Sequence, residues 1–273
     1  MLKIWPFHRD TRKPRIIHID PQNLVPQTRS PEQRAVIDNT DYHDNFHETE
    51  DLIIEFAPRE KSADPQFRKD FSTLAADLKT LDHPGLLQMY SFGEEDGRLY
   101  RTWAKRRMSM ARASTETYNE NCRQLAQAVE GFQALQKVGV AVERYSPQFI
   151  SHDPHQGLFV ARFPFTREGR PARSEFYPHF LEYAIPPKPE SMPAETRFLI
   201  RLGVFIGVYL MNEVPFSEPP LLSEHKGTPI IRKELALPDP LKRLTQLDPN
   251  KNYPDLATGL AETREALQCA PSS

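Results

Sequence analysis

The stretch "VGVAVERYSPQFISHDPHQGLFVARFPF", residues 138–165, has the layout of a loop followed by a β-hairpin. A short apolar entry leads to a proline, and two strand-like runs then flank a turn around Asp153. The only carboxylates in the stretch are Glu143 and Asp153, and they are accompanied by two arginines, Arg144 and Arg162. The pattern predicts a folded loop whose frame is apolar and whose two acids are balanced by two arginines.

The composition is that of a soluble globular protein. The chain has 273 residues, which suits one large domain or two small lobes, with 38% hydrophobic and 26% charged residues. A net charge of −2 gives no general attraction to nucleic acid or to a membrane surface. Two distant cysteines, Cys122 and Cys269, do not make a disulfide framework, and a reducing compartment is expected.

No targeting or membrane-spanning segment is predicted. The start, "MLKIWPFHRD", lacks the apolar core and the small-residue cleavage site of a signal peptide. The longest apolar run, 198–211, is interrupted by Arg201 and is too short to span a bilayer, so we expect a buried helix there. A cytoplasmic location is the expectation.

The first hundred residues are predicted to form an arm and a small β-rich lobe. Residues 1–47 form a proline-rich arm, first basic and then acidic, in which the run 15–19 could pair as an edge strand. Residues 48–104 form the lobe. It contains a strand over 51–58, a helix that is capped by Asp64 and ends before Pro84, and two strands within 86–104 joined by the turn 95–97.

The remainder is predicted to be mainly helical. Residues 105–268 contain a long amphipathic helix from Tyr118, the apolar helix 198–211, a helix that opens at Asp239, and a last one marked by Leu256 and Leu267. Residues 269–273 are a tail, and there are no internal repeats. The predicted fold class is therefore α+β, with a small β-rich lobe and a larger helical lobe.

Six segments, in order, resemble landmarks of the serine/threonine protein kinase superfamily, over roughly residues 48–268. "FSTLAADLKTLDHPGLLQMYSFGEEDGRLYRTW" resembles the family's αC helix, its "HPNIV" turn and the following hairpin. "ALQKVGVAVERYSPQFI" resembles the catalytic loop "ALHxxGIVHRDLKPENI", and "GLFVARFPF" resembles the strand that ends in D-F-G. "YAIPP", "RLGVFIGVYLMNEVPF" and "LTQLDPNKNYPDLATGL" are similar to later helical-lobe motifs. The resemblance implies a two-lobe kinase-like fold with one αC-like helix.

The groups that phosphoryl transfer needs in this family are missing. A glycine-rich loop should precede the strand 51–58, but the first glycine of the chain is Gly85. The strand lysine that grips the phosphates corresponds to Glu55, and its glutamate partner corresponds to Leu74. The resemblance therefore implies that ATP binding is absent or weak.

The catalytic loop and the D-F-G motif are altered in the same way. The catalytic aspartate corresponds to Arg144, the metal-binding asparagine to Phe149, and the D-F-G aspartate to Arg162. Two unit positive charges about 4 Å apart repel by roughly 4 kcal/mol at an effective dielectric near 20, so magnesium is not expected at such a site. Supporting residues of the family correspond to Pro187, Phe198 and Asn252. No catalytic, cofactor or metal residue is predicted.

Arginines gather in the same segments. The candidate anion- or partner-binding residues are Arg144, Arg162, Arg167, Arg170 and Arg173. A second group, near the link between the lobes, is Arg101, Lys105, Arg106, Arg107 and Arg112. Guanidinium groups in a cleft suit phosphate or carboxylate recognition. The alternative, which we favour, is that the cleft arginines pair with local acids such as Glu143 and Asp153.

The expected function is that of a catalytically inactive kinase-like domain, a pseudokinase, which acts as a signalling scaffold or allosteric regulator by binding a protein. One alternative is an atypical ATP-dependent phosphotransferase with a reorganised pocket. Another is a module that binds anions, phosphopeptides or nucleic acid through the cleft arginines, although the charge balance makes nucleic acid the least expected ligand. The spacing of the nine histidines and two cysteines does not suggest a zinc site.

Overall fold

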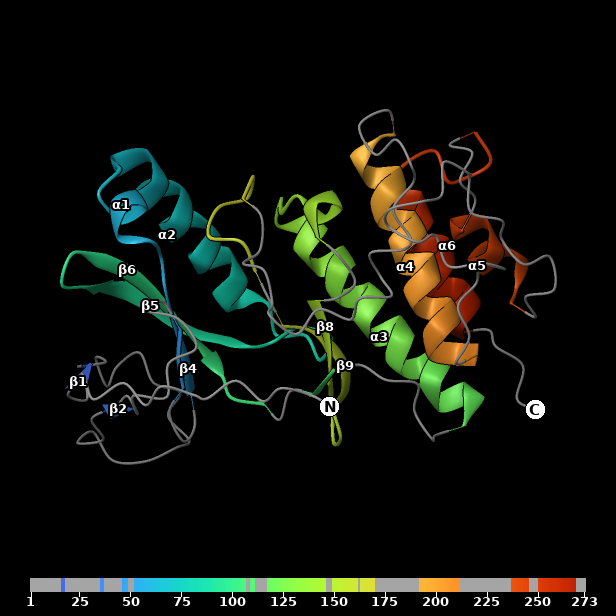
Figure 1. The fold of residues 1–273 in the computed structure, drawn as a ribbon, viewed down its shortest axis with the longest axis horizontal. Helices are drawn as coiled ribbons and strands as arrows, with labels where there is room; N and C mark the ends of the chain where they lie inside the picture. Colours follow the sequence, from blue (N-terminus) through green and yellow to red (C-terminus); the bar gives the residue numbers. More distant parts are fainter. Residues whose placement is uncertain are drawn as a thin grey trace, which may run out of the picture. The chain divides into compact units, whose positions relative to one another are not determined.

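In the computed structural model, the chain forms two compact units (Figure 1). Unit one comprises Met1–Leu81 and Gln88–Arg106, and unit two comprises Asp82–Leu87 and Arg107–Ser273. The structure describes residues 16–17, 35–36, 46–48, 52–106, 109–110, 117–145, 149–161, 163–169, 192–211, 237–245 and 250–268.

Unit one is built on an antiparallel four-stranded sheet with the order β3-β4-β6-β5. The strands are β3 (Phe46–Glu48), β4 (Leu52–Phe56), β5 (Met89–Glu95) and β6 (Arg98–Ala104). The turn between β5 and β6 places Asp96 and Gly97 at φ of 49° and 73°, which is the left-handed pair that a tight hairpin requires. The expected strand and hairpin are confirmed, whereas β3 was not expected.

Two helices accompany this sheet, α1 (Arg59–Ser62) and α2 (Pro65–Thr80). The Asp64 carboxylate accepts a hydrogen bond from the Gln66 amide, and proline occupies the first helical position, as the sequence predicts. α2 packs against β5, where the rings of Phe71 and Phe92 meet edge-on with centroids 6.4 Å apart. The short helix α1 was not expected. A separate two-stranded ribbon pairs β1 (Ile16–Ile17) with β2 (Ala35–Val36), so the described part of the run 15–19 pairs as a strand within its own chain.

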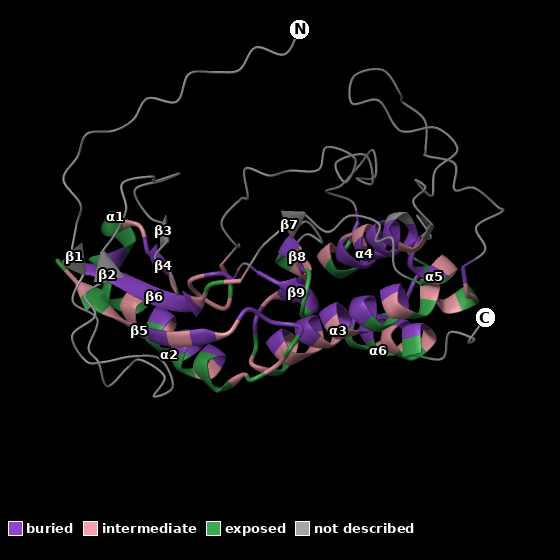
Figure 2. Ribbon diagram, turned by 90° about the horizontal axis from the view of Figure 1, so that it is seen from below, coloured by how far each residue is buried: buried purple, intermediate pink, exposed green. Residues whose placement is uncertain are grey.

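Unit two contains four helices among the described residues. They are α3 (Tyr118–Lys137), α4 (Ala194–Met211), α5 (Asp239–Leu244) and α6 (Leu256–Gln268). α3 packs against α6 and α4, and α4 also packs against α5. Figure 2 shows most of α4 as buried, in agreement with its apolar sequence. Each predicted helix is present, although α4 begins at Ala194 rather than at Phe198.

A three-stranded antiparallel sheet lies beside α3, with the order β7-β8-β9. Its strands are β7 (Ser109–Met110), β8 (Ile150–Asp153) and β9 (Gly157–Val160). The Asp153 carboxylate closes the β8–β9 turn by accepting hydrogen bonds from the amides of His155 and Gln156, at 2.8 and 3.1 Å. The turn predicted around Asp153 is therefore confirmed.

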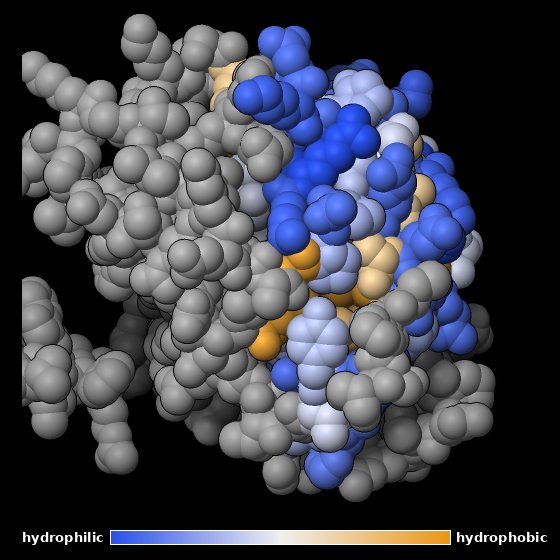
Figure 3. Space-filling model, turned by 90° about the vertical axis from the view of Figure 1, so that its right-hand side faces the viewer, coloured by the Kyte–Doolittle hydropathy of each residue, from blue (hydrophilic) through white to orange (hydrophobic). Residues whose placement is uncertain are grey.

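On the side of unit two that carries α5 and α6, the described residues at the surface are mainly hydrophilic (Figure 3). Figure 3 shows this face, on which only a small group of hydrophobic atoms emerges between polar side chains. Within the residues that the structure describes, no helix is long and apolar enough to cross a bilayer.

Candidate functional site

The loop that follows α3 is short and tightly turned. Gly139 has a φ of 77°, a left-handed conformation that favours glycine and lets the chain leave the helix. The 3₁₀ turn η2 (Val142–Arg144) follows, and the Tyr145 amide donates to the Val142 carbonyl at 2.9 Å. Val142 and Tyr145 are fully buried, whereas Arg144 is exposed. The loop is thus fixed by apolar side chains and presents one cation.

Four aromatic rings pack edge-on through this region, and we refer to them as the aromatic column. The column consists of Phe149, Tyr145, Phe132 and Phe198. Successive centroids are 5.9, 5.8 and 5.1 Å apart, with interplanar angles of 84°, 83° and 81°. Pairs of this geometry each contribute about 0.5–1.5 kcal/mol beyond the burial of their area. The column joins the loop to α3 and α4.

The aromatic column occupies two positions at which the kinase resemblance places polar residues. Phe149 corresponds to the metal-binding asparagine and Phe198 to an aspartate that supports the loop. Both side chains are buried, at 5% and 0% exposure. Magnesium requires oxygen ligands, and a phenyl ring supplies none. A carboxylate placed among these rings would lose its hydration without gaining a partner.

Arg144 pairs with Glu168. Arg144 Nη2 lies 2.8 Å from the Glu168 carboxylate, and Nη1 donates to the backbone carbonyl of the same residue. The side chains are 39% and 78% exposed, so the pair contributes little to stability. The expected pairing with a local acid is met for Arg144, whose partner is Glu168 rather than either of the two acids given as examples, Glu143 and Asp153. Arg162 lies outside the described residues, so its pairing stays a prediction. Asp153 is occupied by the β8–β9 turn.

Arg167 has a structural role. Its Nε donates to the carbonyl of Val138 at 2.8 Å, at the end of α3. Its own carbonyl accepts from the amide of Ala141 at 3.1 Å. Both bonds tie the segment 165–169 to the loop after α3. The other candidate anion-binding residues, Arg162, Arg170 and Arg173, lie outside the described residues, so the structure brings only Arg144 and Arg167 to this loop.

Glu55 forms a buried ion pair within the sheet of unit one. Its Oε2 accepts from Arg101 Nε at 2.8 Å and from Trp103 Nε1 at 3.2 Å. The Arg101 and Glu55 side chains are only 1% and 8% exposed, and the guanidinium lies 4.9 Å from the centre of a Trp103 ring. The charge of Arg101 is therefore neutralised within the sheet, because the strand register puts it opposite Glu55. Arg107 and Arg112 of the expected cationic group lie outside the described residues. Leu74, as expected for an apolar helix position, is buried.

Asn252, a buried amide, stands where the kinase resemblance places an arginine that supports the helical lobe. Asn252 Nδ2 donates to the Leu244 carbonyl at 2.9 Å, and its Oδ1 accepts from the Tyr253 amide at 2.7 Å. The Arg243 guanidinium covers the Tyr253 ring, 4.5 Å from its centre. Burial, aided by Glu262 and opposed by Arg243, raises the pKa of Tyr253 to about 12. Pro187, at the position of the usual partner of that arginine, is not among the described residues.

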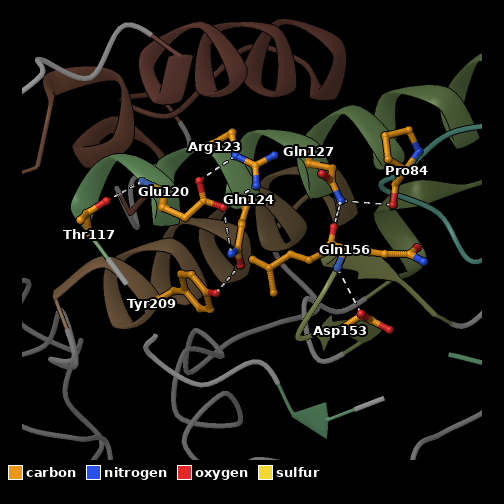
Figure 4. Close-up of polar contacts among 10 residues, drawn as sticks. Pro84, Thr117, Glu120, Arg123, Gln124, Gln127, Asp153, Gln156 and Tyr209 are labelled. Atoms are coloured by element: carbon orange, nitrogen blue, oxygen red, sulfur yellow. Dashed lines mark hydrogen bonds and ion pairs between the residues drawn. The ribbon is translucent and has the colours of Figure 1, made fainter. Parts of the chain in front are cut away.

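Polar side chains on α3 hold the surrounding backbone, as Figure 4 shows. Gln127 Nε2 lies within hydrogen-bonding distance of the carbonyls of Pro84, Gln156 and Leu158, at 3.2, 2.9 and 3.0 Å. One turn earlier, Gln124 accepts from the buried Tyr209 hydroxyl at 2.9 Å. These roles were not predicted, since glutamines on a helix usually indicate a solvated face.

A metal centre is not formed by the described part of the chain. No group of three or more His, Cys, Asp or Glu side chains gathers there. The single cysteine in that part, Cys122, is buried in α3 beside Tyr118, and burial raises the pKa of its thiol. The Cys122 thiol is therefore not presented to solvent as a reactive group.

Comparison with known proteins supports the fold and extends no further. No family model matches the chain, and no curated protein does. Among solved structures, the kinase domain of Mycobacterium tuberculosis PknI matches with a TM-score of 0.50 and 14% identity, covering 88% of this chain and 93% of that one. A doubly substituted form of the same domain gives 0.50 and 15%, covering 81% and 89%. With its antiparallel sheet in unit one and helices in unit two, this chain has the two-lobe α+β fold of a protein kinase-like domain.

Proposed function

We propose that this chain is a pseudokinase, a kinase-like domain that does not transfer phosphate and acts by binding a protein. The observation that carries the proposal is the aromatic column. Phe149 and Phe198 fill with apolar rings two places where the fold's chemistry needs an amide and a carboxylate. Phenyl rings at those two places supply neither a metal ligand nor a charge.

The charged residues add support. Arg144, at the catalytic aspartate position, is a cation held by Glu168 and cannot accept a proton from a substrate hydroxyl. Glu55, at the phosphate-binding lysine position, is an anion that is neutralised by Arg101. At each of the two positions, the side-chain charge is opposite to that of the kinase residue to which it corresponds. We therefore propose that ATP and magnesium bind weakly or not at all.

The partner is proposed to be a protein met in the cytoplasm. A phosphorylated or acidic segment remains the ligand class for which Arg144 is chemically suited, because guanidinium groups bind such anions in a bidentate way. Any such ligand must compete with the Glu168 carboxylate and carbonyl. The exposure of both side chains makes that competition feasible.

Thermal unfolding of the purified chain, with and without ATP and with magnesium or manganese, tests the proposal. A ligand that binds only the folded state, at 100 times its dissociation constant, adds about 2.7 kcal/mol and visibly raises the melting temperature. We expect no shift with millimolar nucleotide. A metal-dependent shift, together with phosphate incorporation that disappears in E143Q or D153N, would instead identify an atypical phosphotransferase.

Titrations of the same sample test the alternative that the chain is an anion-binding module. Inorganic phosphate and a phosphoserine peptide are titrated against the wild-type chain and against R144E, at low and high salt. Binding that is lost in R144E and that falls steeply with salt would favour an anion-binding module over a protein-binding scaffold. The matched control is R123E, since Arg123 is an exposed arginine whose partner Glu120 lies on its own helix.

A further inference from the structure

The segment Asp82–Leu87 is held by unit two although the chain on either side of it belongs to unit one. Its backbone pairs with β9: the Leu87 amide donates to the Val160 carbonyl at 3.0 Å, and the Val160 amide donates to the Gly85 carbonyl at 2.9 Å. We refer to residues 82–87 as the crossover segment. It continues the sheet β7-β8-β9 by one short parallel pairing.

The crossover segment also lies directly on α3. A Cβ added to Gly131 would come within 2.4 Å of the Gly85 carbonyl oxygen, and one added to Gly85 would come within 2.0 Å of the Gln127 carbonyl oxygen. The Gln127 side chain reaches the Pro84 carbonyl, as Figure 4 shows. Backbones in such close contact are sensitive to small shifts of the turn that sets their position.

That turn depends on an unprotonated histidine nitrogen. The Gly85 amide donates to His83 Nδ1 at 3.0 Å, and the Leu86 amide donates to the His83 carbonyl at 2.9 Å. Because Nδ1 accepts this bond, the neutral ring carries its proton on Nε2. A proton on Nδ1 would place two N–H groups against each other and would remove the acceptor.

The charges around His83 act in both directions. Glu130 of α3, whose carboxylate lies 3.9 Å from Nε2, and Asp82 favour the protonated ring, whereas Lys137 of α3 disfavours it. Gln268 of α6 donates to the other Glu130 oxygen at 3.0 Å and so occupies that carboxylate. Burial is the largest influence, and the pKa of His83 is lowered from 6.5.

We propose that His83 makes the crossover segment a pH-sensitive latch: the neutral ring closes the turn onto α3 and β9, and protonation opens it. The latch is closed near neutral pH. As the pH falls below 6.5, the unfolded or locally opened chain binds a proton more readily than the closed one, so opening becomes progressively easier. The device is independent of whether the chain binds nucleotide.

Amide hydrogen exchange of the full-length chain, read at Leu87 and Val160 and corrected for the intrinsic effect of pH, tests the latch. In the wild type we expect protection to fall by about tenfold between pH 7 and pH 5. In H83N, whose side-chain oxygen can replace Nδ1 as acceptor and does not titrate, protection should be the same at both pH values. The matched control is H155N, because His155 is an exposed histidine on the β8–β9 turn, and it should behave as the wild type.

Equal protection of the wild type at the two pH values would overturn the proposal, as would a pH dependence that persists in H83N. Should H83N not fold, nitrogen-15 NMR of the wild-type imidazole provides the decision. A neutral ring with its proton on Nε2 at pH 7, titrating below 6.5, supports the latch. A proton on Nδ1 at pH 7 rules it out.

Discussion

Glu55 and Arg101 lie opposite one another on β4 and β6, and both side chains are buried there. Taking two charges out of water costs several kcal/mol for each, and their attraction offsets this only when the geometry is good. The additional bond from Trp103 to the same carboxylate oxygen helps to satisfy it. The pair is therefore a fixed requirement of this sheet, although it is not a large net source of stability.

The contributions of Glu55 and Arg101 to stability should depend on each other. E55L removes the buried carboxylate that the Arg101 and Trp103 side chains bind, and we expect a loss of about 3–5 kcal/mol in the free energy of unfolding. The double variant E55L/R101L should lose clearly less than the sum of the two single variants. Urea denaturation of all three measures this, with E94Q as the control, because the Arg68–Glu94 pair is exposed and should not matter measurably. Additive losses would mean that the two side chains do not depend on each other.

The buried Tyr253 hydroxyl should make stability fall in strong alkali. Its pKa is raised to about 12, mainly by burial, and it donates to the Pro240 carbonyl at 3.0 Å. Between the usual tyrosine pKa of 10.0 and this value, the folded chain holds a proton that the unfolded chain has released. Stability should therefore fall as the pH rises through this window. Denaturation curves from pH 9 to 12 should show a shallower fall for Y253F, and an identical slope would contradict the assignment.

At the scale of elements, the long helix α3 organises unit two because it carries a glycine where another backbone comes close and polar side chains beside it. Gly131 lets the crossover segment rest on the helix, and Gln127 satisfies carbonyls on either side of that contact. Further along, Phe132 takes part in the aromatic column. The helix thus contacts the crossover segment through Gly131, the β8–β9 hairpin through Gln127 and the aromatic column through Phe132.

The Gly85 backbone lies so close to Gly131 that a side chain there should destabilise the protein. Glycine to alanine in a helix interior normally stabilises by up to about 1 kcal/mol. In G131A the new methyl group would lie 2.4 Å from the Gly85 carbonyl oxygen, so the backbones must separate. We expect a loss of about 1–3 kcal/mol, which reverses the usual sign. The control Q133A, half-buried on the same helix, should stay within about 0.5 kcal/mol of the wild type in thermal or urea unfolding. A stabilised G131A would show that the contact can relax.

At the scale of the whole molecule, the sequence predicts the elements better than it predicts their contacts. The Asp64-Pro65 start of α2, the Asp96-Gly97 turn and the apolar run of α4 are local signals, and each gave the expected element. β3 was missed because three residues are too few for a periodic pattern. α1 was missed because its four residues are mostly polar and exposed.

The site was only partly predictable, for the same physical reason. The substitution of aromatic and cationic residues for acids is visible in the letters, but their partners are not. Arg101 reaches Glu55 only through the register of β4 and β6, and Arg144 reaches Glu168 only through the fold of the segment after β9. The packing of Phe132 on Phe198 joins two helices that are distant in sequence. Such contacts depend on tertiary structure, which a single sequence does not encode in any local pattern.

If the fold has been retained without its chemistry, returning the aspartate and the asparagine of the catalytic loop should damage the protein rather than revive it. Phe149 is buried against Tyr145, so F149N removes a ring from the aromatic column and inserts a polar amide beside the Tyr145 ring. Large-to-small substitution of a buried phenylalanine costs about 3–5 kcal/mol, and an unsatisfied polar group adds to that. Arg144, in contrast, is exposed, and R144D should stay folded while losing its pairing with Glu168.

We therefore expect R144D/F149N to melt well below the wild type and to incorporate no phosphate from labelled ATP with magnesium. R144D alone is the matched control, since it changes the charge of the loop without opening the aromatic column. Its melting temperature should remain near that of the wild type, because an exposed ion pair contributes little. Phosphate transfer that appears in the double variant and is absent from the wild type would refute this view. The scaffold would then be a kinase lacking only two side chains, and the acidic residue at Glu55 and the missing glycine loop would not be obstacles to nucleotide binding.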